Sequence, residues 1–223
     1  MSSEKYNSFW SIIKDNRIEI PTIQRDYTYG RKSATKIREK LVVDIIDNLL
    51  VKKTHNLDFI YGKLLGKENL ISQERNKSNI QSLLKTIKLY ASDLNLEISD
   101  EVITQDVEVL SKINFIPLDG QQRLTTLYLV HWYIAQRNKD KHSLNSLNKF
   151  TYSTRISSKE FCKMLSGELF KFNDETSILS DLICNNEHFF SSWKKDPTVN
   201  SMLVVIDEIH KVFRTKNANY THC

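Results

Sequence analysis

The most constraining feature of the sequence is a nine-residue stretch, residues 119–127, that joins two apolar segments. It follows the short apolar run 113–118 and opens a long apolar segment that ends near Gln136. A short run bounded by turn residues predicts a strand, and a longer periodic run predicts a helix. Gly120 allows the backbone to turn sharply between them. The stretch therefore predicts a strand, a tight turn and the start of a helix.

The first turn of this helix carries groups that suit an anion. Asp119 is a favourable N-cap residue, and Gln122 stands three residues later, where a capping box places Glu or Gln. Unsatisfied backbone N–H groups, the positive end of the helix dipole and Arg123 converge there. A capped helix needs neither an arginine nor the second glutamine, Gln121, so we expect a phosphate site. The alternative is a well-capped, buried helix without a ligand.

A second polar segment follows the predicted strand 17–20, which Pro21 ends. Gln24, Arg25 and Tyr27 supply an amide, a cation and an aromatic ring, which suit ribose, phosphate and base respectively. The alternative is a surface loop that contains one arginine. The segment is thus a second candidate site.

The rest of the chain predicts a helix-rich protein, because Gly and Pro number only five and three. We expect an α/β half over residues 1–136, with 67–111 inserted between core strands, and a helical half over 137–223. Periodicity and capping patterns predict further elements. These are helices at 9–13, 33–52 (capped by Ser33), 79–92, 121–136, from Ser157 (a capping box with Glu160), 175–193 and from Pro197 (capped by Asp196), and a strand at 58–66 with an internal glycine.

Bulk properties exclude several classes of protein. The net charge of +5 permits contact with nucleic acid without demanding it. Three widely spaced cysteines without a CxxC pair argue against zinc and disulfide frameworks and favour the cytoplasm. The polar N-terminal residues predict no signal peptide, and no apolar stretch is long enough to predict a membrane-spanning helix. No GxxxxGK[ST] sequence exists, so a P-loop is excluded.

Together the two polar segments resemble the N-terminal domain of GmrSD-type restriction proteins. The first is IPxxQRxY over residues 20–27, and the second is the gap-free DGQQRLTTL over 119–127. Tyr61-Gly62 resembles the middle strand of the family, and residues 150–162 and 193–203 resemble segments of its long members. The family is similar to the ParB/sulfiredoxin superfamily. The resemblance therefore implies an α+β fold, with a small mixed sheet and helices followed by a helical extension.

The resemblance also implies a function. Family members bind and hydrolyse a nucleoside triphosphate such as ATP or GTP, in bacterial systems that defend against phage DNA. Binding with Mg²⁺ would order the 24–30 loop over the phosphates, and hydrolysis would release it. The residues implied are Asp119, Gln121, Gln122 and Arg123 for catalysis, Asp119 for the metal, and Gln24, Arg25, Tyr27, Gly62, Gly120 and Arg155 for the nucleotide.

Two departures from the family pattern bear on partners. Tyr29 stands where the family often has tryptophan, which keeps an aromatic ring but changes its shape. The six histidines lack the spacing of an HNH nuclease, so DNA cleavage would need a nuclease domain or subunit from elsewhere. DNA is the other expected partner. The main alternative is a non-enzymatic DNA- or partner-binding module, and a ParB-like nuclease is the least favoured.

Overall fold

The computed structural model describes residues 8–22, 25–54, 56–57, 60–66, 79, 82–83, 85–91, 113–173 and 175–220. The chain divides into two compact units, one of residues 1–63 and 115–223 and the other of residues 64–114. Helices and a small mixed sheet occur together, so the fold is α+β, as predicted. None of the described helices is long and apolar enough to cross a membrane.

Four short strands form one sheet, in the order β2-β3-β1-β4. Their bounds are β1 Arg17–Ile20, β2 Gly62–Leu65, β3 Asn114–Pro117 and β4 Phe150–Tyr152. The strands predicted at 17–20 and 113–118 are confirmed. The glycine predicted inside the strand at 58–66 is instead its first residue, and residues 58 and 59 lie outside the described residues.

Strand β4 corrects the expectation that residues 137–223 are helical throughout. It pairs in parallel with β1, with Ile18 opposite Phe150 and Ile20 opposite Tyr152. All three β4 residues are buried, and a strand of three residues is too short for alternation to identify it in sequence. The sheet therefore takes an edge strand from the part of the chain predicted to be helical.

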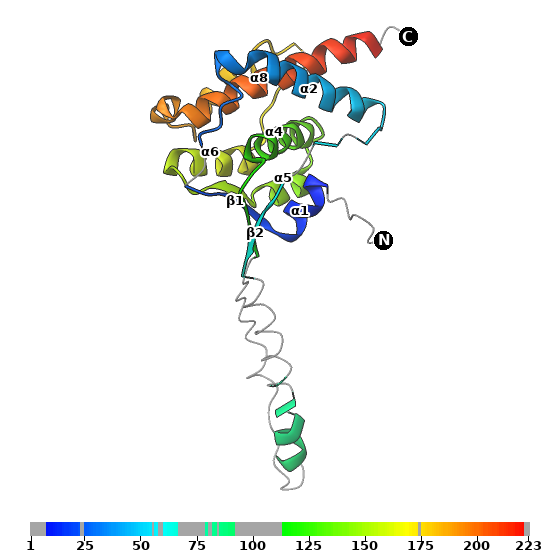
Figure 1. Cartoon of the computed structure of the whole chain (residues 1–223), viewed down its shortest axis with the longest axis vertical. Coiled ribbons are helices and arrows are strands. Elements are labelled where there is room, and N and C mark those ends of the chain that lie inside the picture. The colour runs from blue at the N-terminus through cyan, green and yellow to red at the C-terminus, as the bar shows by residue number, and fades with distance from the viewer. Residues whose placement is uncertain are drawn as a thin grey trace. The chain divides into compact units, whose positions relative to one another are not determined.

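The helices of the larger unit surround one central helix, α4 (Figure 1). Their bounds are α1 Phe9–Asp15, α2 Thr35–Leu50, α4 Gln121–Arg137, α5 Lys141–Leu147, α6 Ile156–Gly167, α7 Leu179–Cys184 and α8 Pro197–Tyr220, with 3-10 turns η1 Lys32–Ala34 and η3 Ser191–Lys195. The helices predicted at 9–13, at 121–136 and from Pro197 are confirmed. Most of α4 is buried, as its continuous apolar surface predicted.

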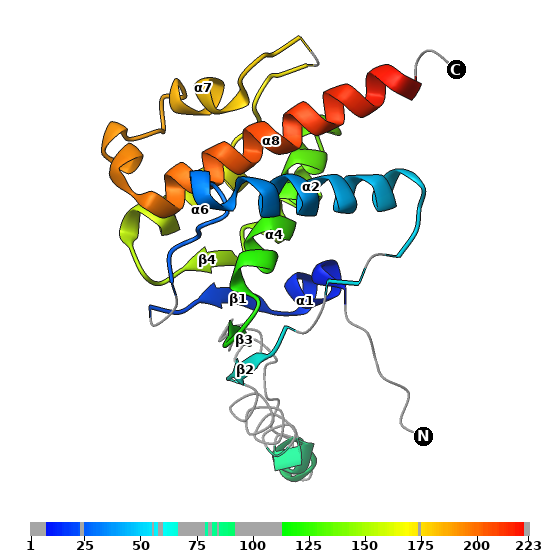
Figure 2. The same cartoon turned by 45° about the horizontal axis from the view of Figure 1, so that its top comes forward.

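Helix α8 packs against both α2 and α4, and Figure 2 shows α2 and α8 side by side. The predicted apolar stripe of α8 is buried along its length: Val199, Met202, Leu203, Ile206, Ile209 and Phe213. Asp196 caps this helix as predicted, because its Oδ1 accepts a hydrogen bond from the Thr198 N–H at 2.8 Å.

Helix α2 buries a different face from the one expected. The sequence repeats an apolar residue every fourth position from Ile37 to Leu49, but these two side chains are 57% and 44% exposed. The buried face carries Val42, Ile45 and Ile46. A four-residue spacing drifts around a helix with 3.6 residues per turn, so its ends leave the core. Ser33 also lies inside η1, so the predicted cap is wrong.

Two further helix predictions need correction. The helix predicted at 175–193 is only α7 and η3, since the Asn186 side chain accepts the His188 N–H at 2.9 Å in a local turn. The predicted cap Ser157 lies within α6, whose N-cap is Arg155 without a side-chain bond. The Ser157 hydroxyl donates to Asp196 instead.

The unit of residues 64–114 contributes a helical segment to the described residues. Residues 79, 82–83 and 85–91 are helical, which confirms the helix predicted at 79–92 where the structure describes it. Leu83, Ile87 and Tyr90 are exposed, and Ala91 is buried.

Candidate functional site

The turn before α4 requires a glycine. Gly120 has φ of 87°, and a Cβ on it would lie 2.7 Å from Ile60 Cγ1. Gly120 is itself the N-cap residue, so the predicted capping by Asp119 is wrong. The turn leaves the Asp119 side chain 61% exposed, with Oδ2 3.7 Å from Arg123 Nη2.

The two glutamines of this first turn hold the main chain of the 25–30 loop. Gln121 Nε2 donates to the Arg25 carbonyl oxygen at 3.1 Å, and Gln122 Nε2 donates to that of Asp26 at 2.9 Å. Gln122 Oε1 accepts the Thr28 N–H at 2.8 Å. The capping box predicted for Gln122 is therefore wrong, because its amide serves the loop. The two polar segments that the sequence predicted as candidate sites nevertheless contact each other.

Tyr27 is buried beneath the loop rather than exposed beside it. Its hydroxyl lies 2.8 Å from Thr126 Oγ1, which donates its one hydrogen to the Gln122 carbonyl oxygen at 2.9 Å. Tyr27 must therefore be the donor to Thr126. Burial raises the pKa of Tyr27, so the phenol stays protonated and keeps its hydrogen for this bond. Its ring is thus part of the support of the loop.

A cavity of about 580 Å³ opens where the loop meets α4. Cavities of this size are typical of small-molecule sites. Its polar lining residues are Arg25, Thr28, Asn56, Asp119, Gln121, Gln122 and Arg123, with Gly120 in the turn. Its apolar and aromatic lining residues are Tyr29, Ile37, Leu41 and Leu57. The exposed α2 residue Ile37 thus forms part of a cavity wall rather than of the core.

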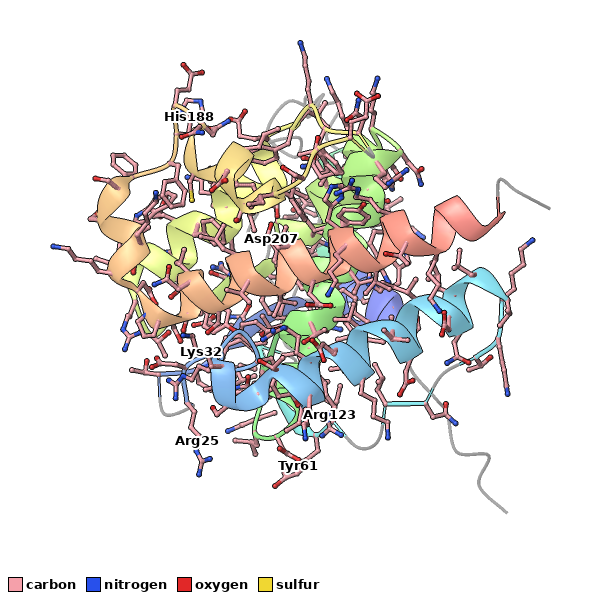
Figure 3. All side chains as sticks on the ribbon, turned by 90° about the horizontal axis from the view of Figure 1, so that it is seen from above. Arg25, Lys32, Tyr61, Arg123, His188 and Asp207 are labelled. Carbon is pink, nitrogen blue, oxygen red and sulfur yellow. The ribbon has the colours of Figure 1, made fainter. Side chains whose placement is uncertain are left out.

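Two of the residues that line this cavity, Arg25 and Arg123, are arginines. Arg123 is largely buried and donates from Nη1 to the Leu57 carbonyl oxygen at 3.2 Å, which orients its guanidinium. Arg25 is exposed, and Figure 3 shows it extending from the ribbon on the same side as Arg123. Burial raises the pKa of Tyr29, and the charge of Arg123 opposes that rise. The buried Gln121 Oε1 has no hydrogen-bond partner among the described residues.

Other predicted site residues lie away from this cavity. A Cβ on Gly62 would lie 2.3 Å from the Ile116 carbonyl oxygen, so this glycine permits close packing of β2 on β3. Arg155 lies at the start of α6, where Nη1 is 3.0 Å from Asp26 Oδ1. It lines a smaller cavity of about 240 Å³ with Arg17 and Lys159. Gln24 lies outside the described residues.

The side chains that line the site limit which metal ions it can bind. The described residues contain no group of three or more His, Cys, Asp or Glu side chains suited to a metal ion. Asp119 is the one carboxylate among the described residues that line the larger cavity. The described residues therefore do not form a metal site whose ligands all come from protein side chains.

Comparison with protein-family models decides the identity of this domain. Residues 9–222 match the model of the GmrSD restriction endonuclease, N-terminal domain. The chain belongs to this family. The match confirms the predicted resemblance and covers both site segments and the helices that follow them. No curated protein and no solved structure matched the chain.

The family places this GmrSD domain in a DNA restriction system and supports a role in defence against foreign DNA. The relation to the ParB/sulfiredoxin superfamily stays a prediction. Tyr29, which the sequence placed in the first motif, lines the cavity, whereas sequence reasoning missed Ile37 and Leu41 as wall residues. The available signal was the pair Ile37 and Leu41, which lie one helical turn apart on a face of α2 that differs from its buried face.

Proposed function

We propose that the cavity at the start of α4 binds a nucleoside triphosphate, and that this GmrSD domain uses the nucleotide to regulate DNA restriction. The observation that carries the proposal is that a helix N-terminus, Arg25 and Arg123 line the same cavity as the apolar and aromatic residues Tyr29, Ile37, Leu41 and Leu57. Phosphates suit the first group, and a base suits the second.

The groups proposed to bind phosphate are already oriented toward an anion. The first turn of an α-helix leaves backbone N–H groups without acceptors inside the helix, and the dipole favours negative charge there. Arg123 is oriented by the Leu57 carbonyl oxygen, so little side-chain freedom is lost on binding. Arg25 is exposed and can close over the phosphates.

The residues present fit a magnesium ion that is bound jointly by protein and phosphate. Such ions need one or two carboxylates and take their remaining ligands from phosphate and water. Asp119 supplies one exposed carboxylate at the mouth of the cavity. Asp119 would hold the ion, which supplies charge neutralisation between the phosphates when bound.

Hydrolysis at this site would depend on electrostatic stabilisation. Arg25 and Arg123 would stabilise the negative charge that builds up on the transferred phosphoryl group. The Gln122 amide is engaged at both ends by the loop, so its role is to position Arg25 and Tyr29. The groups left to orient a water are Asp119 and the amide oxygen of Gln121.

The proposal is tested by titrating the purified domain with ATP, GTP, CTP and UTP, each with Mg²⁺, and by measuring phosphate release. We expect one or more of them to bind, and Arg123→Ala to weaken binding by about 10- to 100-fold, because a hydrogen bond to a charged group contributes about 1.5–3 kcal/mol. Arg137→Ala, at the other end of the same helix, is the matched control. Binding of none of the four would refute the proposal. Salt-sensitive DNA binding without nucleotide would favour the binding-module alternative.

A further inference from the structure

The 25–30 loop is held from two sides. On one side are the two glutamines at the start of α4. On the other side is the start of α8, where Thr198 Oγ1 accepts the Tyr27 N–H at 3.3 Å. Gly30 packs directly on the α8 backbone, since a Cβ on it would lie 2.2 Å from Ser201 Cα. The loop that lines the cavity is therefore in direct contact with the first turns of α8.

Arg155 connects the loop to the start of α8 through charge. Its Nη1 lies 3.0 Å from Asp26 Oδ1 in the loop and 3.2 Å from Asp196 Oδ1 at the N-cap of α8. Arg31 also faces Asp26, but at a longer distance of 3.6 Å, between its Nη2 and Asp26 Oδ2. Arg155 is thus the cation that two carboxylates from different segments share.

Asp196 is a fixed anchor for this cation. Its side chain is buried and accepts hydrogen bonds from Ser157, from Ser158 at 2.7 Å and from the Thr198 N–H at 2.8 Å. Burial raises the pKa of Asp196, but these bonds and the charge of Arg155 outweigh burial, and the net pKa lies below its usual value. A buried charge is stabilised by hydrogen bonds and by pairing, and Arg155 is the cation paired with this one.

We propose that Arg155 is a positioning residue that fixes the nucleotide-binding loop to the start of α8 by bridging Asp26 to Asp196. The inference rests on the proposed function. Asp26 follows Arg25 directly, and its carbonyl oxygen is already held by Gln122. Arg155 holds the carboxylate of Asp26 as well, so both the main chain and the side chain of Asp26 are fixed. The direction in which the neighbouring Arg25 leaves the loop is then fixed too. Movement of the loop around a ligand is then coupled to α6 and α8.

The first test needs no nucleotide. Hydrogen exchange of the Tyr27 and Thr28 backbone amides, whose acceptors are on α8 and α4, is measured in Arg155→Gln and in Arg31→Gln. We expect exchange to accelerate by about three- to tenfold in Arg155→Gln, because the pair is only partly buried, and to change little in Arg31→Gln. Unchanged exchange in Arg155→Gln would overturn the inference. Arg155→Lys, which keeps the charge, should be intermediate and serves if the first variant does not fold.

The second test measures coupling at the ligand site. Asp26→Asn and Arg155→Gln should each weaken triphosphate binding about three- to tenfold, and the double variant should bind no more weakly than the worse single variant. Fully additive losses would show that the two residues act independently and would contradict the bridge. If no triphosphate binds to the wild type, the proposed function fails, and the exchange experiment alone decides whether Arg155 positions the loop.

Discussion

Gln122 Nε2 donates to the Asp26 carbonyl oxygen at 2.9 Å, and this one bond joins segments that lie 96 residues apart in the chain. The same amide accepts the Thr28 N–H through its oxygen. A single side chain therefore satisfies two main-chain groups of the loop, and it does so from the first turn of α4, which lines the cavity.

Replacing Gln122 should loosen the loop and destabilise the fold. Gln122→Ala leaves the Asp26 carbonyl and the Thr28 N–H without this partner, which should cost about 1–3 kcal/mol in the free energy of unfolding. Gln122→Glu keeps an acceptor for Thr28 but places a carboxylate against a carbonyl oxygen, so it should lose a similar amount. Urea denaturation measures both, and wild-type stability in both variants would disprove this role.

A side chain at Gly120 should be poorly tolerated. Gly120→Ala places a Cβ 2.7 Å from Ile60 Cγ1 at φ of 87°, so we expect a loss of about 1–2 kcal/mol. Gly167→Ala is the matched control, because nothing lies within 4 Å of a Cβ there. That control should be neutral or slightly stabilising in thermal melts. Equal effects of the two substitutions would contradict the turn geometry.

The hydroxyl of Tyr27 should matter less than its ring. Tyr27→Phe removes one buried hydrogen bond while Thr126 keeps its bond to Gln122, so the expected loss is about 1 kcal/mol. Tyr152→Phe is a matched comparison, since Tyr152 bonds to Thr125 at 2.6 Å in the same way. Chemical denaturation should give similar losses for both. A loss above about 3 kcal/mol for Tyr27→Phe would point to a role beyond this bond.

Acid should weaken the anchor at Asp196. The pKa of Asp196 is lowered in the folded protein, so its contribution to stability is present above the pKa of the unfolded chain, about 3.9, and is lost as pH falls through the folded value. Asp196→Asn lacks this contribution. The stability difference between wild type and variant should be constant from pH 7 to 5 and shrink below about pH 4. A difference that does not change with pH would contradict the account.

Elements with long, regular patterns were predictable from sequence. The apolar stripe of α8 and the Asp196-Pro197 start signal both agree with the structure, as do the strand, turn and helix around Gly120. Strand β4 was not predictable, because three residues are too few for a periodic pattern and its partner β1 lies about 130 residues earlier in the sequence.

The candidate site was predictable in its location more than in its contacts. The two polar segments meet, but Gln121 and Gln122 bind main-chain atoms, and a carbonyl group has no side-chain signature in the sequence. The cavity wall was missed because Ile37 resembles a core residue by its spacing. Only packing shows which face of α2 turns toward α8.

The central claim is that phosphate groups bind at the start of α4 through Arg123. Its most direct test compares the affinities of the wild type and of Arg123→Ala for a triphosphate and for the matching nucleoside, by calorimetry with Mg²⁺. The account predicts that the wild type binds the triphosphate at least about tenfold more tightly than the nucleoside, and that Arg123→Ala loses most of this preference while keeping its affinity for the nucleoside. An unchanged preference for the triphosphate in Arg123→Ala would contradict it.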